Sequence, residues 1–182
     1  MIQTGKHLVF PYLNVLYFAD EPCTHSFINV SDIESDEGTI SGGVYKDGDS
    51  FGALFPCRAD LNGAVVPGTA WKTSSGIECY VTYDGTRKRQ HNANFEVLTG
   101  PENHKFVWLK KATDGAIPKD AIVGGRNKNL PDFYVARCKV PDNPRVDYAI
   151  EWVAAGTKKA GAYGKDRASR ECMDYEILVC TN

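Results

Sequence analysis

The most constraining feature of the 182-residue sequence is that its second half repeats the first. Five short landmarks occur in the same order in both halves: a Gly-Gly pair, an aromatic run with adjacent Cys and Arg, a Trp, a turn that begins with Tyr, and an aromatic run that contains Glu. The first-half landmarks are residues 42–43, 54–59, Trp71, 83–85 and 94–98, and their partners are residues 124–125, 133–138, Trp152, 163–165 and 174–178. Because each landmark lies about 80 residues from its partner, the sequence predicts a tandem duplication.

Each repeat has the pattern of short strands joined by turns. The 17 Gly and 9 Pro residues are dispersed along the chain, as turn residues between strands are. No segment carries a sustained apolar stripe with the period of a helix. We therefore expect an all-β fold of two similar lobes in one compact unit, with repeat one over residues 36–100 and repeat two over residues 101–182. Residues 1–35 precede the repeats, and we expect them to form N-terminal strands.

The charge balance and the motifs exclude several functions. The chain has 21 Lys and Arg against 23 Asp and Glu, whereas binding to nucleic-acid phosphates needs a clustered basic surplus. No apolar stretch of roughly 18 residues occurs, so we expect no membrane span. The sequence contains neither Gly-x-Ser-x-Gly nor His-Glu-x-x-His, no Cys-x-x-Cys pair, and no His at metal-ligand spacing. We therefore expect a protein that is not an enzyme and holds neither metal nor cofactor.

The six cysteines allow two interpretations. They are Cys23, Cys57, Cys79, Cys138, Cys172 and Cys180. This density is well below that of small disulfide scaffolds, so we expect free, mostly buried thiols, with three disulfides as the alternative. The apolar residues 8–19 are superficially like a signal peptide, but Pro11 and Asn14 interrupt them and no small-x-small cleavage site follows. We therefore expect a cytoplasmic protein, with release from the cell without a signal peptide as the alternative.

The second half also carries a longer ordered pattern. It consists of residues 108–109, 114–122, 124–125, 133–137, 163–166 and 175–178. In these residues the chain resembles the DM-nine repeat proteins of invertebrates, a family that includes mannose-binding lectins. The first half is a more diverged copy, because it lacks the opening Trp and the Ala-Ile-Pro turn. The resemblance covers roughly residues 36–180 and implies an all-β protein in which two repeats intertwine.

The resemblance further implies a sugar site built from polar loop side chains. Lectins of the family use an acidic residue after the Gly-rich turn and a Lys in a Pro-Gly-Lys turn. In this chain Thr69 replaces that Lys in repeat one, and Arg126 and Asn127 follow the Gly-Gly pair of repeat two without an acid. The candidate ligand-binding residues are Lys46, Asp47, Asp49, Thr69, Asp84, Arg126, Asn127 and Lys165.

These residue types match the chemistry of a neutral sugar. Sugar hydroxyls both donate and accept, so carboxylates and amides serve as acceptors while Lys and Arg serve as donors. The same segments also fit solvated polar turns. We expect Trp71, Trp108 and Trp152 to be core aromatics rather than surfaces on which a sugar stacks. We expect Arg58 and Arg137 to pair with carboxylates in the interface between the lobes.

The function expected from these observations is that of a non-catalytic lectin. It would bind mannose-type glycans in pattern recognition and innate immunity, and a homodimer would add avidity. The alternative is an intracellular protein that binds other proteins or vesicles during the stress or immune response. The contact surfaces of that alternative would be the basic residues 86–91 and the unmatched residues 1–35.

Overall fold

The computed structural model describes residues 23–33, 38–47, 50–83, 86–91, 94–140, 143–163 and 169–181. These residues are almost entirely β, with one 3-10 turn at Val30–Asp32, so the expected all-β fold is confirmed. The strands are β1 (Ser26–Asn29), β2 (Gly43–Asp47), β3 (Ser50–Leu61), β4 (Ala64–Thr73), β5 (Gly76–Tyr83), β6 (Thr86–His91), β7 (Phe95–Thr99), β8 (Lys105–Lys110), β9 (Val123–Gly125), β10 (Phe133–Lys139), β11 (Tyr148–Ala154), β12 (Ala160–Tyr163), β13 (Ser169–Cys172) and β14 (Tyr175–Thr181).

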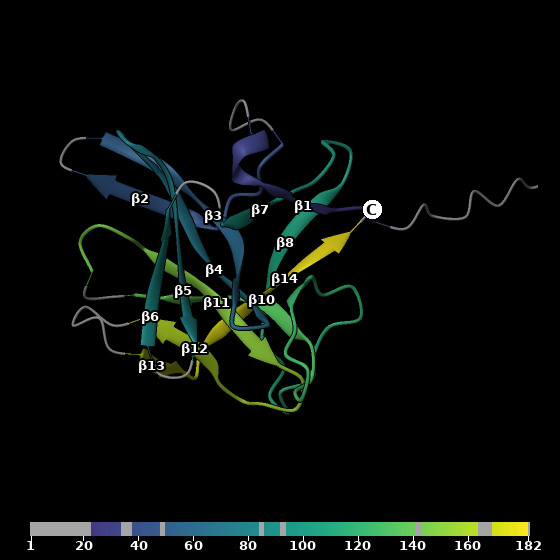
Figure 1. Ribbon diagram of the computed structural model, residues 1–182. Coiled ribbons are helices and arrows are strands. Elements are labelled where there is room, and N and C mark those ends of the chain that lie inside the picture. The colour runs from purple at the N-terminus through teal and green to yellow at the C-terminus, as the bar shows by residue number, and fades with distance from the viewer. Residues whose placement is uncertain are drawn as a thin grey trace, which may run out of the picture.

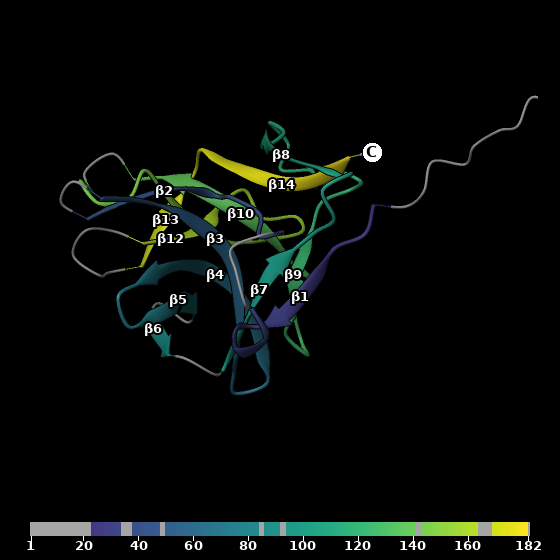
Figure 2. The ribbon, with the colours of Figure 1, turned by 90° about the horizontal axis from the view of Figure 1, so that it is seen from above.

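The strands form two main antiparallel sheets and a separate hairpin (Figure 1). The first sheet has the order β1-β7-β3-β4-β5-β6, and β2 pairs with β3. The second has the order β11-β10-β14-β8, β9 pairs with β10, and β12 pairs with β13. Figure 2 shows β4, β5 and β6 curling away from β1 and β7 on the other side of β3. Taken as β8-β14-β10-β11, the second sheet repeats the order β1-β7-β3-β4, which agrees with the predicted duplication. The common origin of the halves stays a prediction.

The same ion pair occurs at corresponding places in the two sheets. The Nε atom of Arg58 on β3 lies 2.5 Å from a carboxylate oxygen of Glu96 on β7. The Nε atom of Arg137 on β10 lies 2.6 Å from a carboxylate oxygen of Glu176 on β14. The expected pairing of both arginines with carboxylates is confirmed, but each pair joins neighbouring strands of one sheet rather than the two halves. The reason is register, since each Arg stands directly opposite its Glu.

The two sheets share a hydrophobic core. One buried cluster combines residues from both halves: Ile40, Leu54, Leu98, Ile122, Val135, Ile150, Leu178 and Cys180. Trp71 and Trp108 pack against this cluster, and Trp152 packs against a second cluster centred on the first sheet. All three tryptophans are only partly buried, so the expectation that they belong to the core holds in part. Among the described residues, no helix has the length and hydropathy that crossing a bilayer requires.

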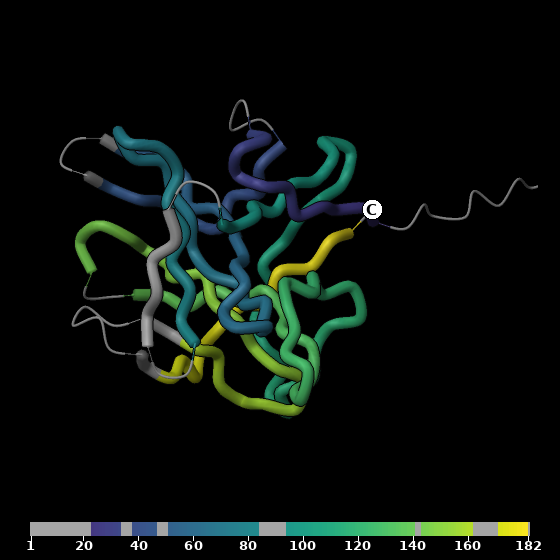
Figure 3. The backbone as a smooth tube through the Cα atoms, in the orientation of Figure 1, coloured from purple at the N-terminus to yellow at the C-terminus, as the bar shows by residue number. Residues whose placement is uncertain are grey.

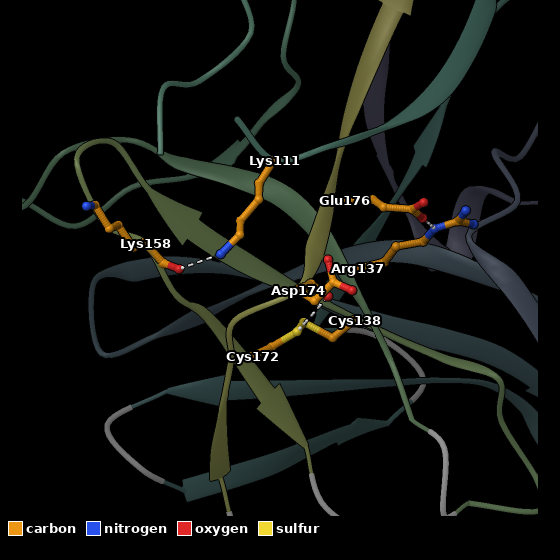
Figure 4. Close-up of a disulfide and its surroundings, with 7 residues drawn as sticks. All are labelled: Lys111, Arg137, Cys138, Lys158, Cys172, Asp174 and Glu176. Atoms are coloured by element: carbon orange, nitrogen blue, oxygen red, sulfur yellow. Dashed lines mark hydrogen bonds and ion pairs between the residues drawn. A yellow bond between two sulfur atoms is a disulfide. The ribbon is translucent and has the colours of Figure 1, made fainter. Parts of the chain in front are cut away.

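The expectation of free thiols is wrong, because all six cysteines form disulfides. The pairs are Cys23–Cys180, Cys57–Cys79 and Cys138–Cys172. The first joins the two ends of the described chain, which lie side by side in Figure 3. The third ties the β12–β13 hairpin to β10 (Figure 4). The low density of cysteines was a poor guide because pairing depends on strand register, which brings residues distant in sequence to Cα–Cα separations of 5.9–6.2 Å.

A candidate binding pocket between the two sheets

A pocket of about 240 Å³ opens where β4 and β5 of the first sheet face β11 of the second. The side of the first half consists of Tyr45, Thr69, Trp71, Tyr80 and Thr82. The side of the second half consists of Asn143, Arg145, Val146, Tyr148, Ala149 and Glu151. Figure 1 shows the strands that carry these two sets, β4 and β5 in blue to teal and β11 in green, side by side. The pocket is therefore assembled from segments far apart in the sequence.

Stacked aromatic rings form one wall of the pocket. The ring centroids of Trp71 and Tyr80 are 4.5 Å apart, with an interplanar angle of 2°. Tyr45 stacks on Trp71 at 5.5 Å and 20°. These rings come from β2, β4 and β5, and Trp71 stacks with both of the others. The packing of each ring against the next makes this wall rigid and apolar.

Buried polar groups lie where the two sides of the pocket meet. Glu151 on β11 is only 3% exposed, and Thr82 on β5 donates a hydrogen bond from Oγ1 to Glu151 Oε1 at 3.3 Å. Thr69 is 7% exposed, and its hydroxyl both donates to the Ile150 carbonyl at 2.8 Å and accepts from the Ile150 N–H at 2.7 Å. These bonds fix β4 and β5 against β11. A carboxylate and hydroxyls at such positions can accept and donate hydrogen bonds to a polyhydroxyl ligand.

The rim of the pocket is held by the segment that precedes β11. The N–H of Lys46 donates to the carbonyl of Arg145 at 2.6 Å. The N–H of Val44 donates to Asp147 Oδ1 at 2.8 Å. These contacts attach β2, which carries Tyr45, to the second half of the chain. The exposed Arg145 and the half-buried Asn143 stand at the mouth as a cation and an amide.

Of the eight candidate residues predicted from the sequence, Thr69 lines this pocket. Lys46 is next to it, but strand alternation turns its side chain away from that of Tyr45, and its ammonium lies 5.4 Å from the Phe51 ring centroid. Asp49, Asp84 and Lys165 lie outside the described residues, as does the side chain of Asp47. None of these four placements is tested.

Arg126 and Asn127 lie elsewhere. The backbone of Arg126 exchanges hydrogen bonds with Val65, and its side chain is exposed. Asn127 donates a hydrogen bond from Nδ2 to the Tyr83 hydroxyl. Arg126 therefore joins the segment after β9 to β4, and Asn127 joins it to β5, both outside the pocket. The side chains of residues 86–91 and most of residues 1–35, on which the alternative function depends, lie outside the described part of the chain.

Sequence reasoning missed Tyr45, Tyr80 and Glu151 as pocket residues. One signal was available for Glu151, because it is the single acid within the otherwise apolar run of residues 148–154. An acid in a strand that is buried on both sides is costly unless it is paired or has a function. The tyrosines gave no such signal, since aromatic residues are ordinary in strands.

Two shifted groups lie away from the pocket. Burial and, to a smaller extent, the positive charge of Arg58 lower the pKa of His25. Burial raises the pKa of Tyr175. Neither residue lines the pocket, so these shifts report on the surrounding fold. The described residues contain no group of three or more His, Cys, Asp or Glu side chains that could hold a metal ion.

Comparison with known proteins adds one finding. A family model described as the DM9 repeat matches residues 49–145, just over half of the chain. The match includes Trp71, Tyr80 and Thr82 of the aromatic side of the pocket, together with Asn143 and Arg145 of its rim. No curated protein matches the chain.

Proposed function

The chain belongs to the DM9 repeat family, and from that premise we propose that it is a carbohydrate-binding protein whose ligand occupies the pocket between β4, β5 and β11. The observation that carries the proposal is the composition of this pocket. An aromatic wall centred on Trp71 faces the buried carboxylate of Glu151, and the Thr82 hydroxyl, on the same side as the rings, bonds to that carboxylate. A pyranose has an apolar face of C–H groups and a periphery of hydroxyls, and the aromatic and polar groups of the pocket match these two parts.

The proposed ligand is a mannose-type glycan. The support for this finer statement is the resemblance to lectins of the family together with the neutral, polar character of the threonine hydroxyls. A hydrogen bond to a charged group contributes about 1.5–3 kcal/mol. A few such bonds give dissociation constants in the millimolar to micromolar range.

The proposed action is binding without catalysis. Hydrolysis of a glycosidic bond ordinarily uses two carboxyl groups on opposite sides of the bond. Among the described residues that line the pocket, Glu151 is the one carboxylate. A single carboxylate suits recognition better than acid–base chemistry.

The proposed setting is pattern recognition in innate immunity outside the cytosol. Three disulfides are typical of proteins that work in oxidising compartments. Of the two predicted locations, release from the cell therefore agrees better with the fold than the cytoplasm does. The described lining of the pocket comes from one chain, and the proposed homodimer would add avidity.

Calorimetric titration with mannose tests the proposal, with the variants Glu151→Gln and Glu96→Gln in parallel. Glu151→Gln keeps the size of the side chain and removes its charge, so we expect mannose affinity to fall about tenfold. Glu96→Gln changes the ion pair on the first sheet, outside the pocket, and affinity stays within twofold of the wild type. Full affinity in Glu151→Gln would show that the ligand lies elsewhere. A folded wild type that binds neither mannose nor any glycan on an array would contradict carbohydrate binding itself.

A further inference from the structure

We infer that Arg137 is a positioning residue for this pocket: it holds the two opposite walls in the geometry that the ligand requires. The inference rests on the proposed function, because the readout is ligand affinity. Arg137 does not line the pocket. It acts through residues that do, and it contacts both halves of the chain.

The side chain of Arg137 makes four contacts. Its guanidinium carbon lies 4.1 Å from the ring centroid of Tyr148 and 4.6 Å from that of Trp108. Nε pairs with Glu176 at 2.6 Å, an interaction drawn in Figure 4 between β10 and β14. Nη1 donates to the carbonyl of Gly42 at 3.1 Å. The side chain is 17% exposed, so solvent screens these contacts only weakly.

Two of these contacts lead to the pocket walls. Tyr148 begins β11 and lines the pocket directly. Gly42 precedes β2, the strand that carries Tyr45 into the aromatic wall. Trp108 supports the same segment by donating from Nε1 to the carbonyl of Ser41 at 3.2 Å. One guanidinium therefore contacts both Tyr148 on one side and the start of β2 on the other.

Only a planar cation with several donors can make these contacts together. The guanidinium stacks on aromatic faces while its N–H groups bond in the ring plane. A Lys at the same place would keep the charge, but it would lose the stacking geometry and the fixed fork of donors. Arg137→Lys therefore tests whether the pocket needs the geometry of the guanidinium, because this variant keeps the positive charge.

The first sheet supplies a matched control. Arg58 pairs with Glu96 at 2.5 Å, and its guanidinium carbon lies 4.1 Å from the Phe27 ring centroid. Its environment is thus chemically similar, with a side chain 28% exposed. None of these three residues lines the pocket. Arg58→Lys accordingly alters an ion pair and a ring contact of the same kinds without touching either wall.

The experiment measures mannose affinity and thermal stability for both variants. We expect Arg137→Lys to weaken mannose binding five- to tenfold and Arg58→Lys to leave it within twofold, while the two melting temperatures fall by similar amounts. In a double-mutant cycle with Tyr148→Ala, the effect of Arg137→Lys on affinity becomes smaller, because the Tyr148 contact is one of the two by which Arg137 reaches the pocket walls. Equal affinities in Arg137→Lys and Arg58→Lys, or additive effects in the cycle, would overturn the inference.

A second measurement keeps the inference testable if the wild type binds no sugar, a result that would contradict the proposed function alone. Tyrosine ring resonances are compared by NMR in the wild type, Arg137→Lys and Arg58→Lys. We expect Arg137→Lys to shift the resonance of Tyr45, which lies on β2 just after the Gly42 carbonyl that Arg137 bonds to. A Tyr45 resonance that is unchanged in Arg137→Lys would contradict the positioning role.

Discussion

Thr69 illustrates how one side chain serves both the fold and the pocket. The sequence singled it out as a ligand-binding residue because it replaces the Lys of a Pro-Gly-Lys turn. The structure places it in the pocket wall, but its hydroxyl already bonds to both the N–H and the carbonyl of Ile150. A hydroxyl has one donor and two acceptor sites. One acceptor site therefore remains for a ligand, and the main role of Thr69 is to bridge β4 and β11.

Replacing Thr69 by Val tests this bridge. Val has nearly the same shape, but it leaves the buried N–H and carbonyl of Ile150 without their partner, so we expect the free energy of unfolding to fall by about 1–3 kcal/mol. Thr99→Val removes an exposed hydroxyl that donates to the Ser26 carbonyl at 3.2 Å. That control should change stability by no more than about 0.5 kcal/mol. Urea unfolding measures both, and equal stability of the two variants would show that the bridge contributes nothing.

At the scale of elements, β4 is a strand of the first sheet whose two neighbours are joined by a disulfide. It lies between β3 and β5, and the disulfide Cys57–Cys79 joins those two flanking strands. Gly68 pairs with Cys57 on one side and Val81 on the other. A Cβ at Gly68 would overlap the carbonyl oxygen of Tyr80. β4 therefore needs a glycine at position 68, where it lies between the two strands that the disulfide joins.

We expect Gly68→Ala to lower the free energy of unfolding by about 1–3 kcal/mol, because the overlap involves backbone that cannot turn aside. Gly52→Ala is the control, since a Cβ at Gly52 meets nothing within 4 Å. In that variant the reduced freedom of the unfolded chain makes stability equal to or slightly above that of the wild type. Thermal unfolding compares the two, and a Gly68→Ala variant as stable as Gly52→Ala would contradict the account of β4.

The strands could be predicted from the sequence where local residue patterns determine them. The predicted strand-like runs at residues 94–98, 133–138 and 174–178 correspond to Phe95–Thr99, Phe133–Lys139 and Tyr175–Thr181. Alternating apolar residues and turn residues carry that information. The strand order, and the packing of β4 and β5 against β11, depend on contacts between residues far apart in the sequence. The periodicity of apolar residues carries no information about such contacts.

The pocket was less predictable for the same reason. Its aromatic wall needs Tyr45, Trp71 and Tyr80 in register across separate strands, and a shift of one residue turns a side chain to the other face. Polar turns attracted attention because sugar-binding groups are polar, yet Asn127 in such a turn bonds to Tyr83 instead. A search for binding residues among polar turns therefore finds Thr69 and misses the pocket residues on the strands, such as Tyr80 and Glu151.

At the scale of the whole molecule, the two halves cannot act separately. They share a buried cluster that includes Leu54 and Ile150, and Cys23–Cys180 links positions with a sequence separation of 157. In the chain-entropy description, a crosslink that closes a loop of this length stabilises the folded state by about 5 kcal/mol. The pocket lies across this shared interface, so its integrity depends on the folding of the complete unit.

The most direct test of the pocket as the carbohydrate site is a mannose titration of ¹⁵N-labelled protein followed by NMR. We expect the amide resonances of Tyr45, Trp71 and Glu151 to shift together with one dissociation constant, because the ligand contacts both halves at once. Shifts confined to the turn at Arg126 and Asn127, or no shifts at saturating mannose, would contradict this account.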